Sequence, residues 1–591
     1  MLTGGGILVI LVILFLVVSL YFDLIRPVLV FFLASLVFLV SGVIDSKDFM
    51  AGFANEQIVV VILLLVLSDI VKKTGILDVL LVNIFNPEIG YRRFLAKMSA
   101  SVASISGFVN NTPLVAIMMP YVYDWARKKN ISPSKVLIPL SYATIFGGTI
   151  TLVGTSTNLV VNGFATDAGL PSLGMFDFTI VGVPLAFFGV LYLTFVASRL
   201  LPDRKDALSD FKEKSREYIV ETKIAKGSHL IGKTVEAAGL RKLQGLFLVE
   251  IVRDEERIAP VSPKQSLEEG DVLLFAGATN TIIDLLQANN GLSLPKYSAI
   301  PDQEQMQIIE VVISAQSDLI GRIVKETNFR GKYDSAIVAI NRNGERINGK
   351  LGEVELQSGD LLLLVAGSDF ESRANDEQDF YLISRVREIH NINRFKSFSL
   401  LAGTVAAFVC AAMGVLSLFE SLLLLFCGIA AMRLVKFSDL KKSFDADLYL
   451  ILVLSLSFGK AISKSGLDQM IAEKIINGVA PLGSSIAILA VIYIITNVLA
   501  MLITNKAAVA IMFPITLATV KASGLDPTPF ILAIAFAGSA EFMTPYGYQT
   551  NLMVYGPGGY KFKDYIKVGW GLSLIYMIVA VTILSYYYEL K

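Results

Sequence analysis

The stretch Asn111-Thr-Pro-Leu-Val-Ala-Ile-Met-Met-Pro120 decides the fold, because it recurs later in the chain as Asn505-Lys-Ala-Ala-Val-Ala-Ile-Met-Phe-Pro514. The two stretches share the asparagine, the run Val-Ala-Ile-Met and the proline at an offset of 394 residues. Polar residues at the start of each stretch interrupt an otherwise apolar region. Unsatisfied backbone is costly in lipid, so an interruption of this kind is tolerated only where it faces protein or a water-filled cavity.

A second pair of interruptions follows in the same order. Gly154-Thr-Ser-Thr-Asn-Leu159 matches Gly547-Tyr-Gln-Thr-Asn-Leu552 at an offset of 393 residues. Convergent Gly and Asn turn chemistry in apolar surroundings is the alternative explanation, but two motifs in one order at nearly one offset favour an internal repeat. Paired interruptions at corresponding positions of two halves point to the binding site of a secondary transporter.

The composition places the chain in a membrane. Of its 591 residues 54% are hydrophobic and 17% charged, whereas soluble domains have about 45–50% apolar and about 25% charged residues. The 51 basic and 51 acidic residues cancel, so charge gives no sign of a nucleic-acid partner. Two histidines and two cysteines leave no material for a metal centre, a disulfide framework or a Cys–His nucleophile. We therefore expect a lipid-embedded protein that is not an enzyme and has no covalent cofactor.

The charged residues concentrate in the middle of the chain, because residues 201–400 hold more than half of them. This middle part repeats itself. His229-Leu-Ile-Gly-Lys233 recurs 89 positions later as Asp318-Leu-Ile-Gly-Arg322, among β-branched strands and turn residues. We expect a membrane block at 1–202, a small α+β domain at 203–293, a second copy with its exit linker at 294–396, and a second membrane block at 397–591.

The broken helices indicate the kind of ligand. A break leaves N–H groups at one half-helix start, which suit an anion, and C=O groups at another half-helix end, which together with Asn and Thr oxygens suit a small hard cation such as sodium. We therefore expect a small inorganic or organic dianion as substrate. The residues expected to bind it are Asn111, Thr112, Thr155, Ser156, Asn505, Lys506, Gln549 and Thr550.

Two ionisable residues stand out in the second membrane block, since charges within membrane spans are costly and usually functional. Lys506 lies among Ala and Ile, and Glu541 lies just before the second break. Lys506 can hold the anion, occupy the place of a coupling cation with Glu541 as its charge partner, or extend to an interface. Glu541 has the alternative of a solvated carboxylate at a loop tip.

With these residues quoted, both membrane blocks resemble the divalent anion–sodium symporter (DASS, solute carrier 13) family of sulfate and dicarboxylate transporters. Members carry Ser-Asn-Thr at the tip of each of two re-entrant hairpins, and Asn110-Asn111-Thr112 and Thr504-Asn505-Lys506 occupy those places here. The resemblance implies inverted repeats, an elevator mechanism and a homodimer. Lys506 replaces the threonine of the motif and would bring an ammonium group to the second cation site. The implied sodium ligands are Asn110, Asn111, Gly154, Thr504, Asn505 and Gly547.

The insert resembles two tandem TrkA-C (RCK C-terminal) domains, which implies regulation from the cytosol. It carries no Gly-x-Gly-x-x-Gly after a strand, so NAD is not expected. Relatives of such domains bind a cyclic di-AMP-like nucleotide; a dimerising or autoinhibitory cap is the alternative. Arg199 and Arg204 at the first junction agree with a cytoplasmic insert by the positive-inside rule.

These observations predict a secondary active transporter in the cell membrane. The expected substrate is a divalent oxyanion, with sulfate first, and the expected coupling ion is sodium. Two alternatives stay open: a C4-dicarboxylate symporter or exchanger of the same family, and an RCK-regulated cation transporter. The second has no Thr-Val-Gly-Tyr-Gly filter to support it.

Overall fold

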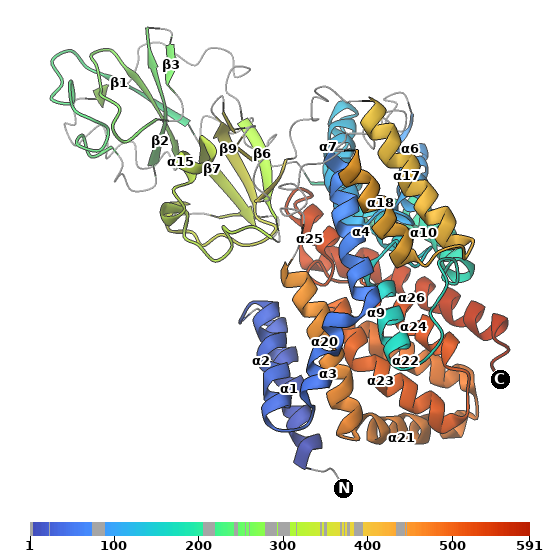
Figure 1. Cartoon of the computed structure of the whole chain (residues 1–591). Helices are drawn as coiled ribbons and strands as arrows, with labels where there is room; N and C mark the ends of the chain where they lie inside the picture. The colour runs from blue at the N-terminus through green and yellow to red at the C-terminus, as the bar shows by residue number, and fades with distance from the viewer. Residues whose placement is uncertain are drawn as a thin grey trace.

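The chain forms a helical body and a β-rich insert that projects from one end of it (Figure 1). The structure is a computed structural model. It describes residues 4–22, 24–73, 89–204, 219–240, 246–254, 256–258, 261–277, 292–293, 308–314, 316–342, 345–347, 351–366, 369–370, 373–374, 379–382, 394–432, 444 and 446–591. Much of the predicted exit linker, residues 383–393, lies outside this described part.

The helical body consists of two blocks that flank the insert in sequence. The helices of the first block are α1 (Gly4–Tyr21), α2 (Pro27–Val40), α3 (Ser46–Met50), α4 (Glu56–Lys73), α6 (Tyr91–Ser106), α7 (Asn111–Lys128), α8 (Leu137–Gly148), α9 (Ser156–Asp167) and α10 (Thr179–Tyr192). Those of the second are α17 (Arg394–Ala412), α18 (Leu418–Ala431), α20 (Ala446–Lys464), α21 (Leu467–Val479), α22 (Ser485–Leu502), α23 (Asn505–Ser523), α24 (Pro527–Ser539), α25 (Gln549–Tyr555) and α26 (Phe562–Tyr587).

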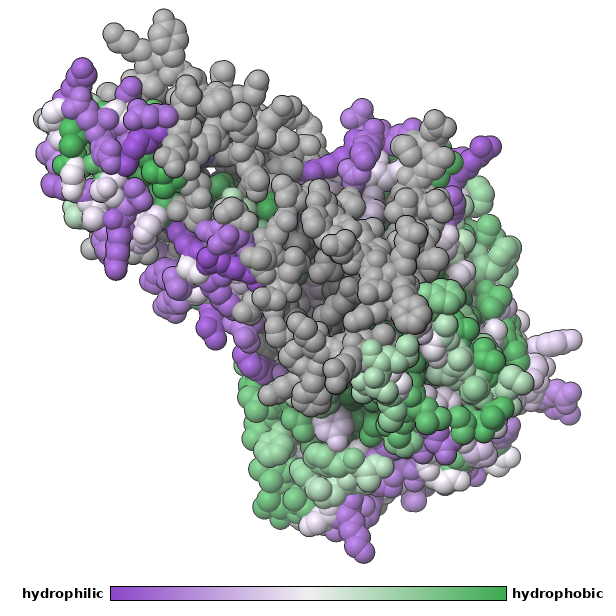
Figure 2. All heavy atoms as spheres, turned by 45° about the horizontal axis from the view of Figure 1, so that its top comes forward, coloured by the Kyte–Doolittle hydropathy of each residue, from purple (hydrophilic) through white to green (hydrophobic). Residues whose placement is uncertain are grey.

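The helical body is suited to a bilayer. Among the described residues, six helical segments are long and apolar enough to cross a membrane: Ser46–Ser68, Thr179–Leu200, Ala446–Lys464, Ser485–Leu502, Asn505–Ser523 and Phe562–Tyr587. Figure 2 shows apolar residues over much of the helical body and mostly hydrophilic residues on the insert, where the surface is not grey. The chain is therefore a polytopic, predominantly helical membrane protein.

Each predicted interruption coincides with a break between two helices. Residues 107–110 separate α6 from α7, and residues 149–155 separate α8 from α9. In the second half, residues 503–504 separate α22 from α23, and residues 540–548 separate α24 from α25. The motifs therefore mark the starts of four helices, where backbone N–H groups have no partner within the helix.

The two halves interlock rather than stand side by side. Helix α9 of the first half packs on α23 and α24 of the second half, and α25 of the second half packs on α7 and α8 of the first. The short helix that follows each break therefore lies against the helical hairpin of the other half. A site at the breaks must consequently be built from residues of both halves.

The repeat is also visible in hydrogen bonds. Asn158 donates from Nδ2 to the carbonyl oxygen of Thr151 at 2.9 Å, and Asn551 donates from Nδ2 to that of Thr544 at 3.1 Å. Both pairs span seven residues and correspond at the offset of 393. Each asparagine thus holds the non-helical backbone of its own break, which leaves that backbone satisfied in an apolar environment.

The insert contains two five-stranded antiparallel sheets of one topology. The first has the order β3-β2-β4-β1-β5 and the second the order β8-β7-β9-β6-β10. The strands of the first sheet are β1 (Ile219–Ile224), β2 (Leu246–Arg253), β3 (Glu256–Ile258), β4 (Val272–Gly277) and β5 (Leu292–Ser293). Those of the second are β6 (Ile308–Ile313), β7 (Ser335–Arg342), β8 (Glu345–Arg346), β9 (Leu361–Ala366) and β10 (Phe380–Leu382).

A buried ion pair recurs in the two sheets at the 89-residue offset of the sequence repeat. Arg253 donates from Nε to Oδ1 of Asp271 at 2.8 Å, and Arg342 donates from Nε to Oδ1 of Asp360 at 2.7 Å. Each sheet has its own apolar core, and a third cluster joins the two through residues such as Val249, Val338 and Val365. The two sheets are therefore packed on one another.

Candidate functional site

Asn111, the first residue of α7, is the centre of a buried polar cluster. Its side chain is 2% exposed. Ser106 donates from Oγ to Asn111 Oδ1 at 2.6 Å, and Asn111 donates from Nδ2 to the Tyr548 hydroxyl at 2.6 Å. The Tyr548 hydroxyl also lies 3.1 Å from Oγ1 of Thr155, in hydrogen-bond contact. The tip of the first hairpin and both breaks therefore meet at one tyrosine.

A second contact joins the same two helix starts. Thr112 donates from Oγ1 to Oε1 of Gln549 at 3.1 Å, between α7 and the first residue of α25. Behind it, Ser141 of α8 donates from Oγ to Oδ1 of Asn551 at 2.7 Å and lies 3.0 Å from Oγ1 of Thr550. Thr550 thus faces α8 and supports the position of α25.

Backbone oxygens crowd around Gly154 in a way that suits a small hard cation. A Cβ at this position would collide with the carbonyl oxygen of Gly148 and would lie 2.8 Å from that of Ser106 and 3.0 Å from that of Gly107. The side chain of Asn111 adjoins the same place, because its Oδ1 would lie 2.6 Å from a Cβ on Gly148. Unwound carbonyls and amide oxygens of this kind are the ligands that sodium uses in transporters. Several oxygens of this ligand type therefore gather around Gly154, and they leave no room for a side chain there.

In the second half a carboxylate occupies the corresponding place. Glu541 stands at the repeat position of Gly148, is completely buried, and lies so close to Gly547 that a Cβ there would collide with it. Among the described residues no hydrogen-bond donor reaches either carboxylate oxygen. Lys506 acts on Glu541 electrostatically, and Glu541 on Tyr548 in turn. Glu541 is thus not a solvated loop-tip carboxylate but a buried side chain at the junction of both halves.

Two of the predicted sodium ligands have another role. Asn110 is the N-cap of α7, since its Oδ1 accepts from the N–H of Thr112 at 3.3 Å. Thr504 is the N-cap of α23, since its Oγ1 accepts from the N–H of Ala507 at 3.3 Å. Both oxygens satisfy N–H groups that the helix leaves free, so the structure gives these residues a structural function at the hairpin tips.

The structure therefore joins most of the predicted residues in one region. Asn111 and Thr155 are joined through the Tyr548 hydroxyl, and Thr112 bonds Gln549 directly. Asn505 lies by the start of α9, because its carbonyl oxygen and Thr157 both approach Gly538. Ser156 and Lys506 are half-buried at the starts of α9 and α23. Among the described residues no cluster of His, Cys, Asp and Glu could hold a metal ion.

Sequence reasoning missed three residues of this region. Tyr548 stands at the repeat position of Thr155, and that correspondence was the signal that could have found it. Ser106 and Ser141 lie within helical segments, where a serine that bonds its own backbone is common. Ser106 bonds a residue 5 positions away and Ser141 bonds one 410 positions away. The neighbouring sequence does not predict either contact.

Buried breaks, interlocked halves and a polar centre within apolar helices define a membrane transporter. The chain belongs to the citrate transporter family, whose profile matches residues 9–422 and 396–590. This family is related to the divalent anion–sodium symporters that the hairpin motifs resemble.

Three relatives illustrate the range of this similarity. The chain is 31% identical over 561 residues to an uncharacterized transporter (sll0640) of Synechocystis sp., covering 92% of this chain and 90% of the relative. It is 22% identical over 742 residues to "Sodium/sulfate cotransporter 1" of Chlamydomonas reinhardtii, covering 91% and 84%. Over 133 residues it is 30% identical to "Sodium-dependent dicarboxylate transporter SdcS" of Staphylococcus saprophyticus, covering 22% and 25%.

Proposed function

We propose that the chain is a secondary active transporter of a divalent oxyanion, with sulfate as substrate and sodium as coupling ion. One observation carries this proposal: the starts of α7 and α9 meet at Tyr548, and the start of α23 lies beside them. Helix N-termini present free N–H groups and the positive end of the helix dipole. Three of them around one polar centre favour a compact anion.

The second charge of the anion has a partner in Lys506. A charge-assisted hydrogen bond is about twice as strong as a neutral one, and Lys506 is the second residue of α23, beside the second hairpin tip. The completely buried Glu541 lies close enough for Lys506 to act on it electrostatically. A dianion that enters thus meets Lys506, the helix starts and the amide of Gln549.

In this proposal sodium binds in the first half. The carbonyl oxygens of Ser106, Gly107 and Gly148 and the amide oxygen of Asn111 supply the ligands near Gly154. In the second half Glu541 and Lys506 occupy the corresponding place. One sodium ion per transport cycle, rather than two, follows from this difference.

The remaining features of the proposal rest on the hairpin motifs and on the insert. The protein acts as a homodimer in the cell membrane and moves its anion by an elevator motion. The insert lies in the cytoplasm as two TrkA-C domains that regulate transport, with a cyclic di-AMP-like nucleotide as candidate ligand. The basic end of α7, with Arg127 and Lys128, supports this orientation because it lies on the side of the insert (Figure 1).

Uptake by purified protein in liposomes tests the proposal. Labelled sulfate should accumulate when an inward sodium gradient is imposed, with a Hill coefficient for sodium near one. Excess unlabelled succinate should compete weakly; strong competition would favour the C4-dicarboxylate alternative. Potassium flux independent of sulfate, or no anion uptake under any gradient, would overturn the proposal.

A further inference from the structure

We infer that Tyr381, a residue of the insert, is a positioning residue of the anion site. Through its hydroxyl it orients the amide of Gln549, so the second sheet of the insert sets the affinity of the membrane site directly. This inference deepens the proposed function and rests on it. Under this inference the insert contributes a residue that supports the anion site. This role is separate from any ligand that the insert itself binds.

The first step is the position of the second sheet on α25. Val312 of β6 and Leu361 of β9 are buried in the same apolar cluster as α25 and the membrane helices. Gly359 and Gly556 approach so closely that a Cβ on Gly556 would lie 2.6 Å from the carbonyl oxygen of Gly359. The sheet therefore packs on the short helix that follows the second break, as Figure 1 shows at the label α25.

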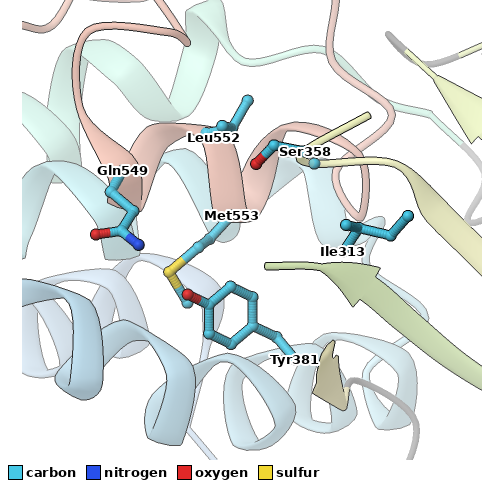
Figure 3. A pocket seen from close by; sticks show the side chains of 7 residues that line it. Ile313, Ser358, Tyr381, Gln549, Leu552 and Met553 are labelled. Carbon is cyan, nitrogen blue, oxygen red and sulfur yellow. The ribbon is translucent and has the colours of Figure 1, made fainter. Parts of the chain in front are cut away.

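The second step is the pair Tyr381 and Gln549. They line a small pocket together with Ile313, Ser358, Gly359, Leu552 and Met553, and their side chains face one another in Figure 3. Burial raises the pKa of the Tyr381 phenol, and hydrogen bonds from Ser314 and Gln549 lower it in part. The Gln549 side chain thus lies against the insert at Tyr381.

The third step is the other end of the same amide. Its Oε1 accepts from Thr112 of the first hairpin at 3.1 Å. Gln549 is therefore held at its oxygen by the membrane block, and its side chain faces Tyr381 of the insert across a small pocket. An amide that is confined between the two has fewer orientations, which lowers the conformational entropy lost on binding an anion.

The fourth step is the rigidity of the strand that carries Tyr381. β10 pairs with β6, with Tyr381 opposite Val312, and Asp379 anchors its start. The Asp379 carboxylate accepts from Ser317 Oγ at 2.7 Å, from the N–H of Asp318 at 2.9 Å and from Lys332 Nζ at 3.0 Å. Tyr381 is consequently placed by a buried network and not by a free terminus of the sheet.

The test is a pair of conservative substitutions in the full-length protein in liposomes. Tyr381→Phe keeps the ring and removes only the hydroxyl. It should raise the KM for sulfate about fivefold to tenfold, the effect of one lost hydrogen bond, while maximal uptake changes less than twofold. In a Gln549→Ala background the same substitution should have no further effect, because the group that it positions is gone.

Glu345→Gln is the matched control, since it removes a different contact between the insert and the membrane block. Glu345 accepts from Lys561 Nζ at 2.6 Å, and both side chains are exposed, so its loss should leave the KM unchanged. A normal KM in Tyr381→Phe, or equal effects of that change with and without Gln549, would overturn the inference and leave the proposed function intact. No sulfate uptake by the unaltered protein would instead reject the proposed function.

Discussion

The two halves of the membrane body have the same breaks but different charges. At corresponding positions the first half has Thr112 and Gly148, and the second has Lys506 and Glu541. Around Gly154 the first half gathers backbone carbonyl oxygens, whereas beside Gly547 the second half places a buried carboxylate. The two halves thus share the hydrogen-bonded backbone of their breaks but differ in the charge of the side chains beside it. In the second half a lysine and a completely buried glutamate stand where the first half has neutral residues.

The halves also differ in what lies against the helix after each break. Gly163 of α9 faces Asn55, which donates from Nδ2 to the Gly163 carbonyl oxygen at 3.2 Å. The corresponding Gly556 faces Gly359 of the insert. The helix after the first break is therefore supported from within the membrane block, and the helix after the second break is supported by the insert.

The largest effect is expected from Lys506→Thr, which gives the second half the residue of the first. It removes the ammonium group that we propose to hold the anion and that acts electrostatically on the buried Glu541, and loss of one charged partner at a desolvated contact costs about 2–5 kcal/mol. Sulfate uptake in liposomes should fall about 100-fold. Lys521→Thr, at the exposed end of the same helix, is the control and should transport normally.

The double variant Lys506→Thr/Glu541→Gly then tests whether these two residues account for the difference between the halves. It makes the second half neutral like the first, so uptake should recover in part and the Hill coefficient for sodium should rise towards two. Recovery without any change in sodium dependence would show that the pair only balances charge and does not replace a cation.

The next prediction compares the corresponding asparagines Asn111 and Asn505. Asn111→Ala removes the acceptor of Ser106 and the donor to Tyr548, which should raise the sodium concentration needed for half-maximal uptake about tenfold or more. Asn505→Ala should leave that concentration nearly unchanged, because the proposed sodium site lies in the first half. A larger sodium effect for Asn505→Ala than for Asn111→Ala would reverse the assignment of the cation site.

A smaller effect is expected from alanine at the two corresponding glycines. A Cβ on Gly556 meets a backbone oxygen at 2.6 Å, whereas one on Gly163 meets the movable Asn55 side chain at 3.2 Å. Gly556→Ala should weaken the contact between the insert and α25 and raise the KM for sulfate about threefold. This change corresponds to a fraction of the free energy of one hydrogen bond. Gly163→Ala should leave the KM for sulfate close to that of the unaltered protein. Limited proteolysis of the insert checks whether the KM change accompanies loss of its contact with the membrane block.

The smallest effect on transport is expected at Asp379. Burial raises the pKa of this carboxyl, but hydrogen bonds from Tyr333, Ser317 and Lys332 outweigh burial and leave the pKa below the usual 3.8. Its stabilisation is therefore present above about pH 4 and is lost as the pH falls through the lowered value. Asp379→Asn should weaken amide protection in β10 at pH 7 by about 1–3 kcal/mol, measured by hydrogen exchange.

The control for Asp379 is Asp369→Asn, which removes an exposed ion pair with Arg373 and should alter protection by less than about 1 kcal/mol. The difference between Asp379→Asn and the unaltered protein should shrink when exchange is repeated below pH 3.8. A constant difference across this range would mean that the charge of Asp379 contributes nothing to the strand.

Much of this architecture was accessible from the sequence because both repeats left local marks. The motifs at Asn111 and Asn505 predicted two helix starts, and those at Gly154 and Gly547 predicted the two breaks; the structure has helix boundaries at each. The second membrane block begins with α17 at Arg394, three residues before the predicted 397. The match to the citrate transporter family and the relatives named sodium/sulfate cotransporters confirm a transporter of this broad class.

What the sequence could not show was which residues meet across the repeat. Asn111 and Tyr548 are joined because α25 packs on α7, and no local pattern encodes that crossing. Asn110 and Thr504 stay predicted cation ligands; that their oxygens also cap α7 and α23 depends on backbone geometry that a motif does not give. The contact of Tyr381 with α25 depends on how the insert packs, and the sequence of β10 carries no sign of it.

The crossing of the two halves has a consequence for biosynthesis. The hydroxyl that satisfies Asn111 is supplied 437 residues later, and the whole insert is made in between. At about 5–20 residues per second, roughly 20–90 s pass before Tyr548 leaves the ribosome. The first hairpin must therefore wait in the membrane with its polar tip incomplete while the insert folds, and the binding site closes only when the last three helices arrive.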